Sequence, residues 1–153
     1  MKYKLTISGN VGTDKDQLKR AKEYFEKSFN TAAVTLRSKK NLSNLKIRKD
    51  LPVGFKKTFR KDDAKKYLTV LAKTINVNQA KYSNNTFTIG VPDHHLLKLQ
   101  QYRVDAPNFG LLFVITLEPP GTRCYRRKYK VPQSRNKLIL SESDARFALT
   151  QLL

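Results

Sequence analysis

Apolar and polar side chains alternate along residues 3–8, which is the period-two pattern of a strand with one buried face. The glycines of Gly9–Gly12 supply a turn that ends this strand. Behind the T-x-x-D start signal of Thr13–Asp16, apolar residues recur at helical intervals, and they predict a helix over 14–30. Alternation returns over 33–37, where the sequence predicts a second strand.

The pattern changes in residues 38–61, where cations dominate and apolar residues stand alone. Short strand pieces are predicted around Leu45–Ile47 and Val53–Phe55, with turn chemistry at Pro52–Gly54. The rest of the chain returns to regular periodicity. It predicts a helix over 62–75, a strand over 86–91 and a short helix over 94–103. A central strand is predicted over 111–117, paired as a hairpin with 122–131. A strand over 137–140 and a terminal helix from Ser141 complete the chain.

This order of elements predicts an α+β fold, an antiparallel sheet with helices packed on one face. Its last part, from 93 to 153, reads α-β-β-β-α. Double-stranded RNA-binding domains have this order, but they carry a basic cluster where this chain has Glu142 and Asp144, so the order assigns no family. We predict a single basic domain over 1–153, with a division into 1–92 (β-α-β, basic segment, α-β) and 93–153 as the alternative.

Charge narrows the class of partner. The chain has 31 Lys and Arg against 12 Asp and Glu, a formal net charge of +19 in 153 residues. Such an excess repels itself unless a polyanion accepts it, and nucleic acid is the first candidate. A single cysteine forms no internal disulfide, and the longest apolar run, Leu111–Leu117, falls far short of the roughly 18 residues of a membrane span. We therefore expect a cytoplasmic protein with no membrane partner.

The first candidate site is the predicted strand 122–131, which lies within the sequence GTRCYRRKYKVP of residues 121–132. Alternation places Arg126, Lys128 and Lys130 in a row that repeats every ~6.6–6.8 Å, a spacing suited to successive phosphates. Arg123 and Arg127 are expected on the other face, where they either lie toward its edge or extend their side chains to water. The alternative is a basic edge strand that resists aggregation. Without a neighbouring base or metal ligand, Cys124 is interpreted as a small strand residue.

The second candidate site is the basic segment between the second strand and the second helix. Its predicted phosphate contacts are Lys39, Lys40, Lys46, Arg48, Lys49, Lys56 and Lys57. Phe55 and Phe59 lie among these cations, and aromatic side chains beside cations can stack on unpaired bases. Anchoring of both rings in the core is the favoured interpretation, and base stacking is the alternative.

The sequence Asp93-His94-His95 is the only other arrangement that suggests chemistry. Metal nucleases of the rolling-circle type pair histidines around one intervening residue, whereas adjacent histidines are expected to point apart. We therefore interpret Asp93 as a helix N-cap, with both histidines on an exposed first turn. No catalytic residue, metal ligand or cofactor is predicted, and a metal-dependent nuclease is the alternative to a non-enzymatic protein.

The leading function is a non-enzymatic nucleic-acid-binding protein that contacts mainly the phosphate backbone, of RNA or DNA, through the basic strand and the basic loop. One alternative is a viral or mobile-element protein that binds and modulates a nucleic-acid enzyme or a ribonucleoprotein. In that case its partner is a protein that itself handles nucleic acid. Another alternative is a component of the ribosome or of another ribonucleoprotein.

Overall fold

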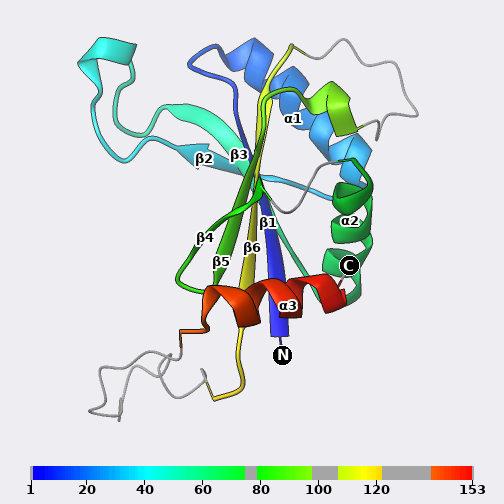
Figure 1. The fold of residues 1–153 in the computed structure, drawn as a ribbon. Helices are drawn as coiled ribbons and strands as arrows, with labels where there is room; N and C mark the ends of the chain where they lie inside the picture. Colours follow the sequence, from blue (N-terminus) through cyan, green and yellow to red (C-terminus); the bar gives the residue numbers. More distant parts are fainter. Residues whose placement is uncertain (1, 75–78, 98–106, 122–138, 153) are drawn as a thin grey trace. The chain divides into compact units, whose positions relative to one another are not determined.

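The computed structural model describes residues 2–74, 79–97, 107–121 and 139–152. Its helices and strands, in chain order, are β1 (Lys2–Asn10), α1 (Lys15–Phe29), β2 (Val34–Arg37), the 3₁₀ turn η1 (Ser43–Leu45), β3 (Pro52–Arg60), α2 (Lys61–Thr74), β4 (Lys81–Ser83), β5 (Thr86–Val91), the 3₁₀ turn η3 (His94–Leu97), β6 (Gly110–Glu118) and α3 (Glu142–Leu152). The strands form one sheet in the order β2-β3-β1-β6-β5-β4 (Figure 1).

Helices α1 and α2 each pack on strand β3 through aromatic side chains. Phe25 of α1 packs on Phe55 of β3, with 5.0 Å between ring centroids. Tyr67 of α2 packs on Phe59 of the same strand at 4.6 Å. Because Phe55 and Phe59 are four positions apart on one strand, their side chains share a face. The α+β prediction, an antiparallel sheet with helices on one face, is confirmed.

The chain forms two compact units, each assembled from separate segments. One contains Met1–Leu5, Phe59–Ile89 and Val114–Leu153, and the other contains Thr6–Thr58 and Gly90–Phe113. Strands β1, β3, β5 and β6 contribute residues to both units. The single domain over 1–153, and its alternative division after residue 92, stay predictions.

Helix α1 begins one residue later than its sequence signal indicates. Asp14, not Thr13, is the N-cap: its Oδ1 accepts hydrogen bonds from the backbone N–H groups of Asp16 at 3.0 Å and Gln17 at 3.5 Å. A carboxylate at this position satisfies amides that have no partner within the helix and interacts favourably with its dipole. Asn30 ends the helix in the left-handed conformation at φ 45°.

Strand β3 corrects the prediction of short pieces separated by a turn. Residues 52–60 form one continuous strand, and Gly54 lies within it. A Cβ at Gly54 would lie 2.4 Å from the carbonyl oxygen of Gly9 on the neighbouring strand β1. Glycine is present here because two backbones approach closely, rather than because the chain turns.

The hairpin of β4 and β5 was not predicted. Asn84 and Asn85 join the strands with φ of 47° and 61°, the left-handed pair of a two-residue type I′ turn. Asn85 also reaches the segment before α3, because its Oδ1 accepts a hydrogen bond from the Leu140 N–H at 2.7 Å. The Tyr82 hydroxyl lies 2.7 Å from the Leu140 carbonyl and 3.1 Å from Asn85 Oδ1.

We expect Asn85→Ala to lower the free energy of unfolding by about 1–3 kcal/mol, because the partly buried Leu140 N–H loses its partner and alanine is strained at positive φ. Asn85→Gly keeps the turn and removes only the amide, so it should recover part of this loss. Urea unfolding followed by circular dichroism measures both changes. Equal stability of the alanine variant and the unchanged protein would contradict the role of Asn85.

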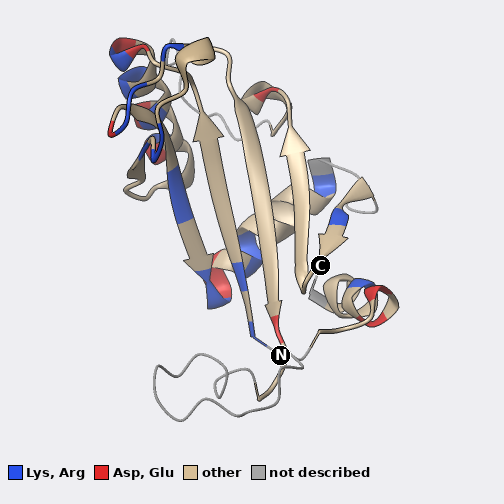
Figure 2. Ribbon diagram, turned by 90° about the vertical axis from the view of Figure 1, so that its left-hand side faces the viewer, with Lys and Arg blue, Asp and Glu red and all other residues tan. Residues whose placement is uncertain are grey.

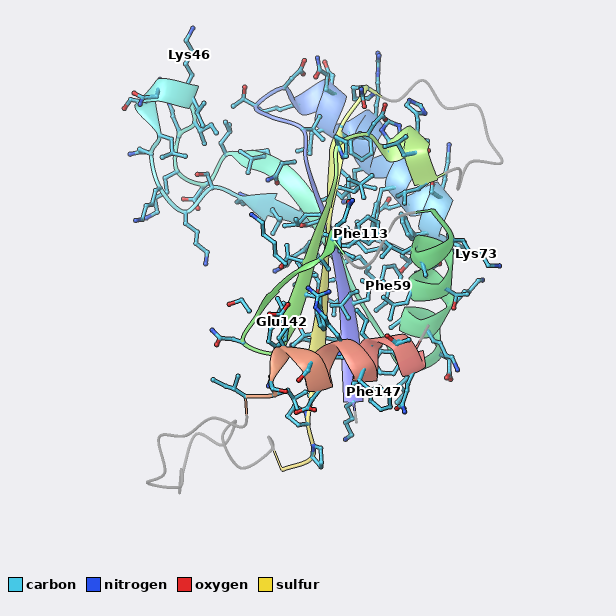
Figure 3. The ribbon with its side chains drawn as sticks, in the orientation of Figure 1. Lys46, Phe59, Lys73, Phe113, Glu142 and Phe147 are labelled. Carbon is cyan, nitrogen blue, oxygen red and sulfur yellow. The ribbon has the colours of Figure 1, made fainter. Side chains whose placement is uncertain are left out.

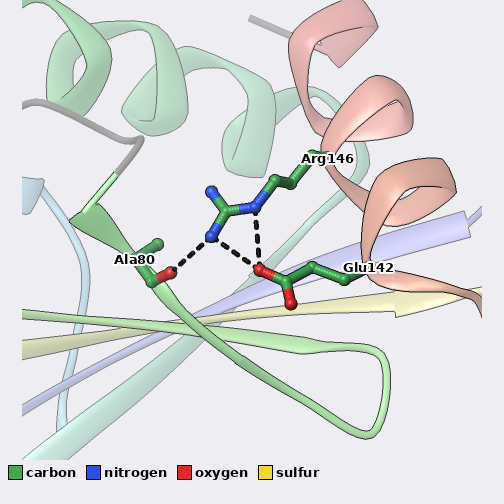
Figure 4. A network of polar contacts seen from close by, with 3 residues as sticks. All are labelled: Ala80, Glu142 and Arg146. Carbon is green, nitrogen blue, oxygen red and sulfur yellow. Dashed lines mark hydrogen bonds and ion pairs between the residues drawn. The ribbon is translucent and has the colours of Figure 1, made fainter.

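Helix α3 starts where the sequence predicts. The Ser141 Oγ accepts from the Asp144 N–H at 3.2 Å, and the hydroxyl donates to Asp144 Oδ2 at 2.6 Å. Arg146 then ties the helix to the sheet (Figure 4). It donates to Glu142 Oε1 at 2.8 Å and to the Ala80 carbonyl at 3.4 Å, and its guanidinium lies 5.9 Å from the Phe87 ring centroid.

Other parts of the predicted C-terminal order differ or lie outside the described residues. Within those residues, the helix expected over 94–103 is the 3₁₀ turn η3. Strand β6 is present, and its sheet neighbours are β1 and β5, whereas the expected hairpin partner 122–131 lies outside the described residues. Of the expected strand 137–140 only the last two residues are described, and they are not in a strand. None of the described helices is long and apolar enough to cross a membrane.

Candidate nucleic-acid interface

The segment 38–51 between β2 and β3 is a loop with its own internal structure. Its base is closed by hydrogen bonds from Ser38 N–H to the Leu51 carbonyl and from Asp50 N–H to the Ser38 carbonyl, each 2.9 Å long. Leu42 and Ile47 exchange backbone hydrogen bonds of 2.8 and 3.1 Å across it. The backbone of the loop is therefore held in one shape by local contacts.

The Asn41 side chain supplies a further link within this loop. Its Oδ1 accepts a hydrogen bond from the Lys49 N–H at 2.6 Å. The chain reverses direction at η1, and Lys46, which follows it, has a left-handed backbone conformation with φ 53°. The loop thus presents its cations from a fixed backbone.

Five predicted contact residues lie on this loop and all are exposed: Lys39, Lys40, Lys46, Arg48 and Lys49. Lys46 is at the outer end of the loop, with its side chain pointing away from the sheet (Figure 3). With Arg48 and Lys49 it lines a hollow of about 650 Å³, together with Asn41, Ser43 and Ile47. Asp50 is the only acidic residue in 38–51. The loop is a strongly positive surface.

The other two predicted contacts of this segment, Lys56 and Lys57, lie on β3 and do not share a surface. Lys56 is exposed and pairs across the strands with Val34, whose side chain is 61% exposed. Lys57 is half-buried and lies on the face that carries Phe55. Figure 2 shows the strands mostly in tan, with blue bands of Lys and Arg on β3 and near the start of β1. Of these two lysines, only Lys56 adds its charge to the open face of the sheet.

The phenylalanines of this segment are core residues. Phe55 is 0% and Phe59 is 5% exposed, so the anchoring interpretation is confirmed and base stacking by these rings is excluded. The predicted basic strand, with Arg123, Arg126, Arg127, Lys128 and Lys130, lies outside the described residues, as does Cys124. Its role stays a prediction.

Sequence reasoning missed two features of the basic segment. Arg37, at the end of β2, is exposed beside the base of the loop. Leu42 and Leu45 are 46% and 63% exposed, whereas the sequence predicts a short strand piece around Leu45–Ile47. The polar residues around them, in NLSNLK, were the available signal that no continuous strand covers these side chains.

The structure corrects the interpretation of Asp93-His94-His95. His94 is not exposed but 2% accessible, with its ring stacked on Phe109 at 4.2 Å and edge-on to Tyr24 at 4.6 Å. The two histidine rings do not point apart, since their centroids are 4.0 Å from each other. The capping interpretation of Asp93 is confirmed, because its Oδ1 accepts from the His95 N–H at 2.9 Å.

Burial also acts on the protonation of His94. Burial lowers the pKa of His94, and the neighbouring His95 acts in the same direction, whereas the Phe109 backbone and Asp93 act weakly in the opposite one. Burial likewise raises the pKa of the Tyr24 hydroxyl, whose ring lies edge-on to that of His94. At neutral pH His94 is therefore an uncharged imidazole with a free lone pair.

Comparison with known proteins assigns the family. No family model matches the chain. The large ribosomal subunit protein uL5 of Methanobrevibacter smithii is 30% identical over 135 residues, which cover 84% of this chain and 79% of the relative. The chain belongs to the uL5 family. The uL5 proteins of Methanococcus aeolicus and Sulfolobus acidocaldarius are 29% and 27% identical, over 93% and 83% of this chain and 82% and 73% of their own lengths.

Membership of the uL5 family changes the order of the predicted functions. The relatives are named as proteins of the large ribosomal subunit. This supports the ribonucleoprotein alternative over the leading prediction of an unspecified nucleic-acid binder. None of the uL5 relatives supports the mobile-element alternative.

Proposed function

We propose that this chain is a non-enzymatic RNA-binding component of the large ribosomal subunit, working in the cytoplasm, where its neighbours are ribosomal RNA and other ribosomal proteins. Its relatives in the uL5 family carry the name of that subunit and align with most of the chain. The net charge of +19 agrees with a partner made of phosphates. RNA takes precedence over DNA because the family is ribosomal.

The observation that carries the proposed contact surface is the loop 38–51. Its five cations are all exposed, and none forms an ion pair with an acid in the described part of the chain. The backbone that carries them is closed by hydrogen bonds at its base and across its middle. A loop that is already ordered loses little conformational entropy when it binds. Its charges are therefore available to phosphates at low cost.

The exposed leucines give this loop a second kind of contact. Leu45 directly precedes Lys46, and its side chain is 63% exposed. Apolar side chains gain by lying against the faces of bases, while cations on the same loop bind phosphates. Mixed contacts of this kind suit folded RNA, whose loops and bulges expose bases beside the backbone. A loop that served solubility alone would gain nothing from exposed leucines.

The expected result is binding to purified large-subunit ribosomal RNA that weakens steeply with salt. Five phosphate contacts predict a log–log slope of about −4 and a loss of roughly 10²-fold in affinity between about 50 and 200 mM salt. Filter binding with a salt series measures the slope. Unlabelled double-stranded DNA of equal length should compete poorly. A complex indifferent to salt, or DNA that competes as well as the RNA, would contradict the proposed function.

A further inference from the structure

Asp93, His94 and His95 form a cluster of metal-ligating side chains outside the proposed RNA contacts. Each offers one ligand atom, and these atoms lie within 4.8 Å of one another. It is the only group of three or more His, Cys, Asp or Glu side chains that close together among the described residues. All three follow the end of β5 and lie in one compact unit.

The second observation is the unsatisfied imidazole of His94. The residue is 2% exposed, and neither Nδ1 nor Nε2 has a hydrogen-bond partner among the described residues. In the described part of the chain, no other buried side-chain nitrogen or oxygen lacks a hydrogen-bond partner. Buried polar groups are nearly always satisfied, and a bound ion is one of the usual reasons for an apparent exception.

The distances within the cluster suit coordination. His94 Nδ1 and Asp93 Oδ1 are 3.6 Å apart. In a tetrahedral site with bonds of about 2.0–2.1 Å, neighbouring ligand atoms are ~3.3–3.4 Å apart, so one ion between these two atoms requires only a small shift. When Oδ1 of Asp93 caps the turn, the second carboxylate oxygen of Asp93 is available to coordinate the ion. His95 is exposed, so its ring can turn toward the same ion.

The donor set indicates the class of metal. Two imidazoles and one carboxylate suit zinc, cobalt, nickel and copper rather than magnesium or calcium, which prefer oxygen alone. His94 is held by Phe109 and Tyr24, so one ligand is fixed in place before the ion arrives. A preorganised ligand lowers the entropy cost of binding. A fourth coordination position would be open to water.

We propose that Asp93, His94 and His95 bind one divalent transition-metal ion of the zinc class at the end of β5. The ion ties η3 to the aromatic residues that surround His94. This site is independent of the RNA contacts of loop 38–51, and either assignment can fail without the other.

The test uses untagged, full-length protein freed of metal with a chelator and then titrated with Zn²⁺ in a calorimeter. We expect saturable binding of one equivalent and a melting temperature that rises with zinc concentration, since a ligand of the folded state stabilises it. Co²⁺ in the same site should give visible ligand-field absorption without a thiolate charge-transfer band. Absence of saturable binding at one equivalent overturns the proposal.

Variants separate this site from other metal-binding groups. His95→Ala and Asp93→Asn should each weaken zinc binding at least about 10-fold, comparable to losses seen around known sites. Both variants leave the core intact, and asparagine retains an oxygen that can cap the turn. Asp63→Asn and Cys124→Ser are the matched controls and should bind as the unchanged protein does. Unchanged affinity in His95→Ala, or loss of binding in Cys124→Ser, overturns the proposal.

Discussion

Replacing Lys46, Arg48 and Lys49 together by alanine is expected to weaken binding to large-subunit ribosomal RNA by about 10²-fold at about 150 mM salt. Each phosphate contact contributes about −0.7 to −0.9 to the slope of affinity against salt on logarithmic axes, so the slope should fall by about 2–3. These three side chains line one hollow of the loop and are all exposed. Their removal should therefore change binding without changing the free energy of unfolding by more than ~0.5 kcal/mol. Filter binding and urea unfolding measure the two quantities.

The matched control removes the same number of positive charges elsewhere. Lys19 on α1 and Lys65 and Lys66 on α2 are exposed helix residues, and their joint replacement by alanine lowers the net charge equally. If general attraction to RNA were the whole effect, both triple variants would lose the same affinity, and the loop would not be the contact surface. The triple variant Arg126→Ala/Lys128→Ala/Lys130→Ala tests the predicted basic strand in the same assay.

Phe55→Ala is expected to lower the free energy of unfolding by about 3–5 kcal/mol, because a buried aromatic ring leaves a cavity that its neighbours fill only in part. Phe55 is 0% exposed, and its ring lies 5.0 Å from that of Phe25 and 5.6 Å from that of Phe109. Urea unfolding at neutral pH measures the loss. A loss below about 1 kcal/mol would show that this ring is not central to the core.

Gly9→Ala probes the same place from the other side. A Cβ at Gly9 would lie 2.6 Å from the Phe55 ring, whereas one at Gly90 would meet nothing within 4 Å. Overpacking should therefore make Gly9→Ala cost about 1–3 kcal/mol, while Gly90→Ala stays within ~0.5 kcal/mol of the unchanged protein. Combination of Gly9→Ala with Phe55→Leu should cost less than the sum of the two single changes, because leucine gives the methyl group room. Additive losses would contradict the contact.

The elements that the sequence predicted well are those with one buried face. Helices α1 and α2 and strand β1 follow from periodicity, because burial of a single face imposes a period of 3.6 or 2 on apolar residues. Strand β6 follows from the continuous apolar run Leu111–Leu117, which turn residues bound on both sides. The sequence predicts a short strand piece with a turn, rather than the continuous strand β3, because Pro52 and Gly54 are turn residues in most settings. The physical reason for Gly54 lies on another strand, at the Gly9 carbonyl, and no local window contains it.

The sequence likewise predicted only part of the candidate site. The sequence supplied the basic loop and its cations, since charge is visible in composition. It could not show that Lys56 and Lys57 point to opposite faces of the sheet, because that depends on the continuity of β3. Nor could it show the backbone hydrogen bonds that hold the loop. Both features depend on the backbone conformation of the folded chain, which composition alone does not specify.

The sequence by itself determined the net charge, the amphipathic helices and strands, and the anchoring of Phe55 and Phe59 beside the basic loop. Only the tertiary structure decided the environment of the two histidines. His94 and His95 are neighbours in the sequence, yet one is enclosed by Phe109 and Tyr24 while the other faces solvent. Burial is a property of what packs around a side chain, and those aromatic residues come from distant segments that only folding brings together.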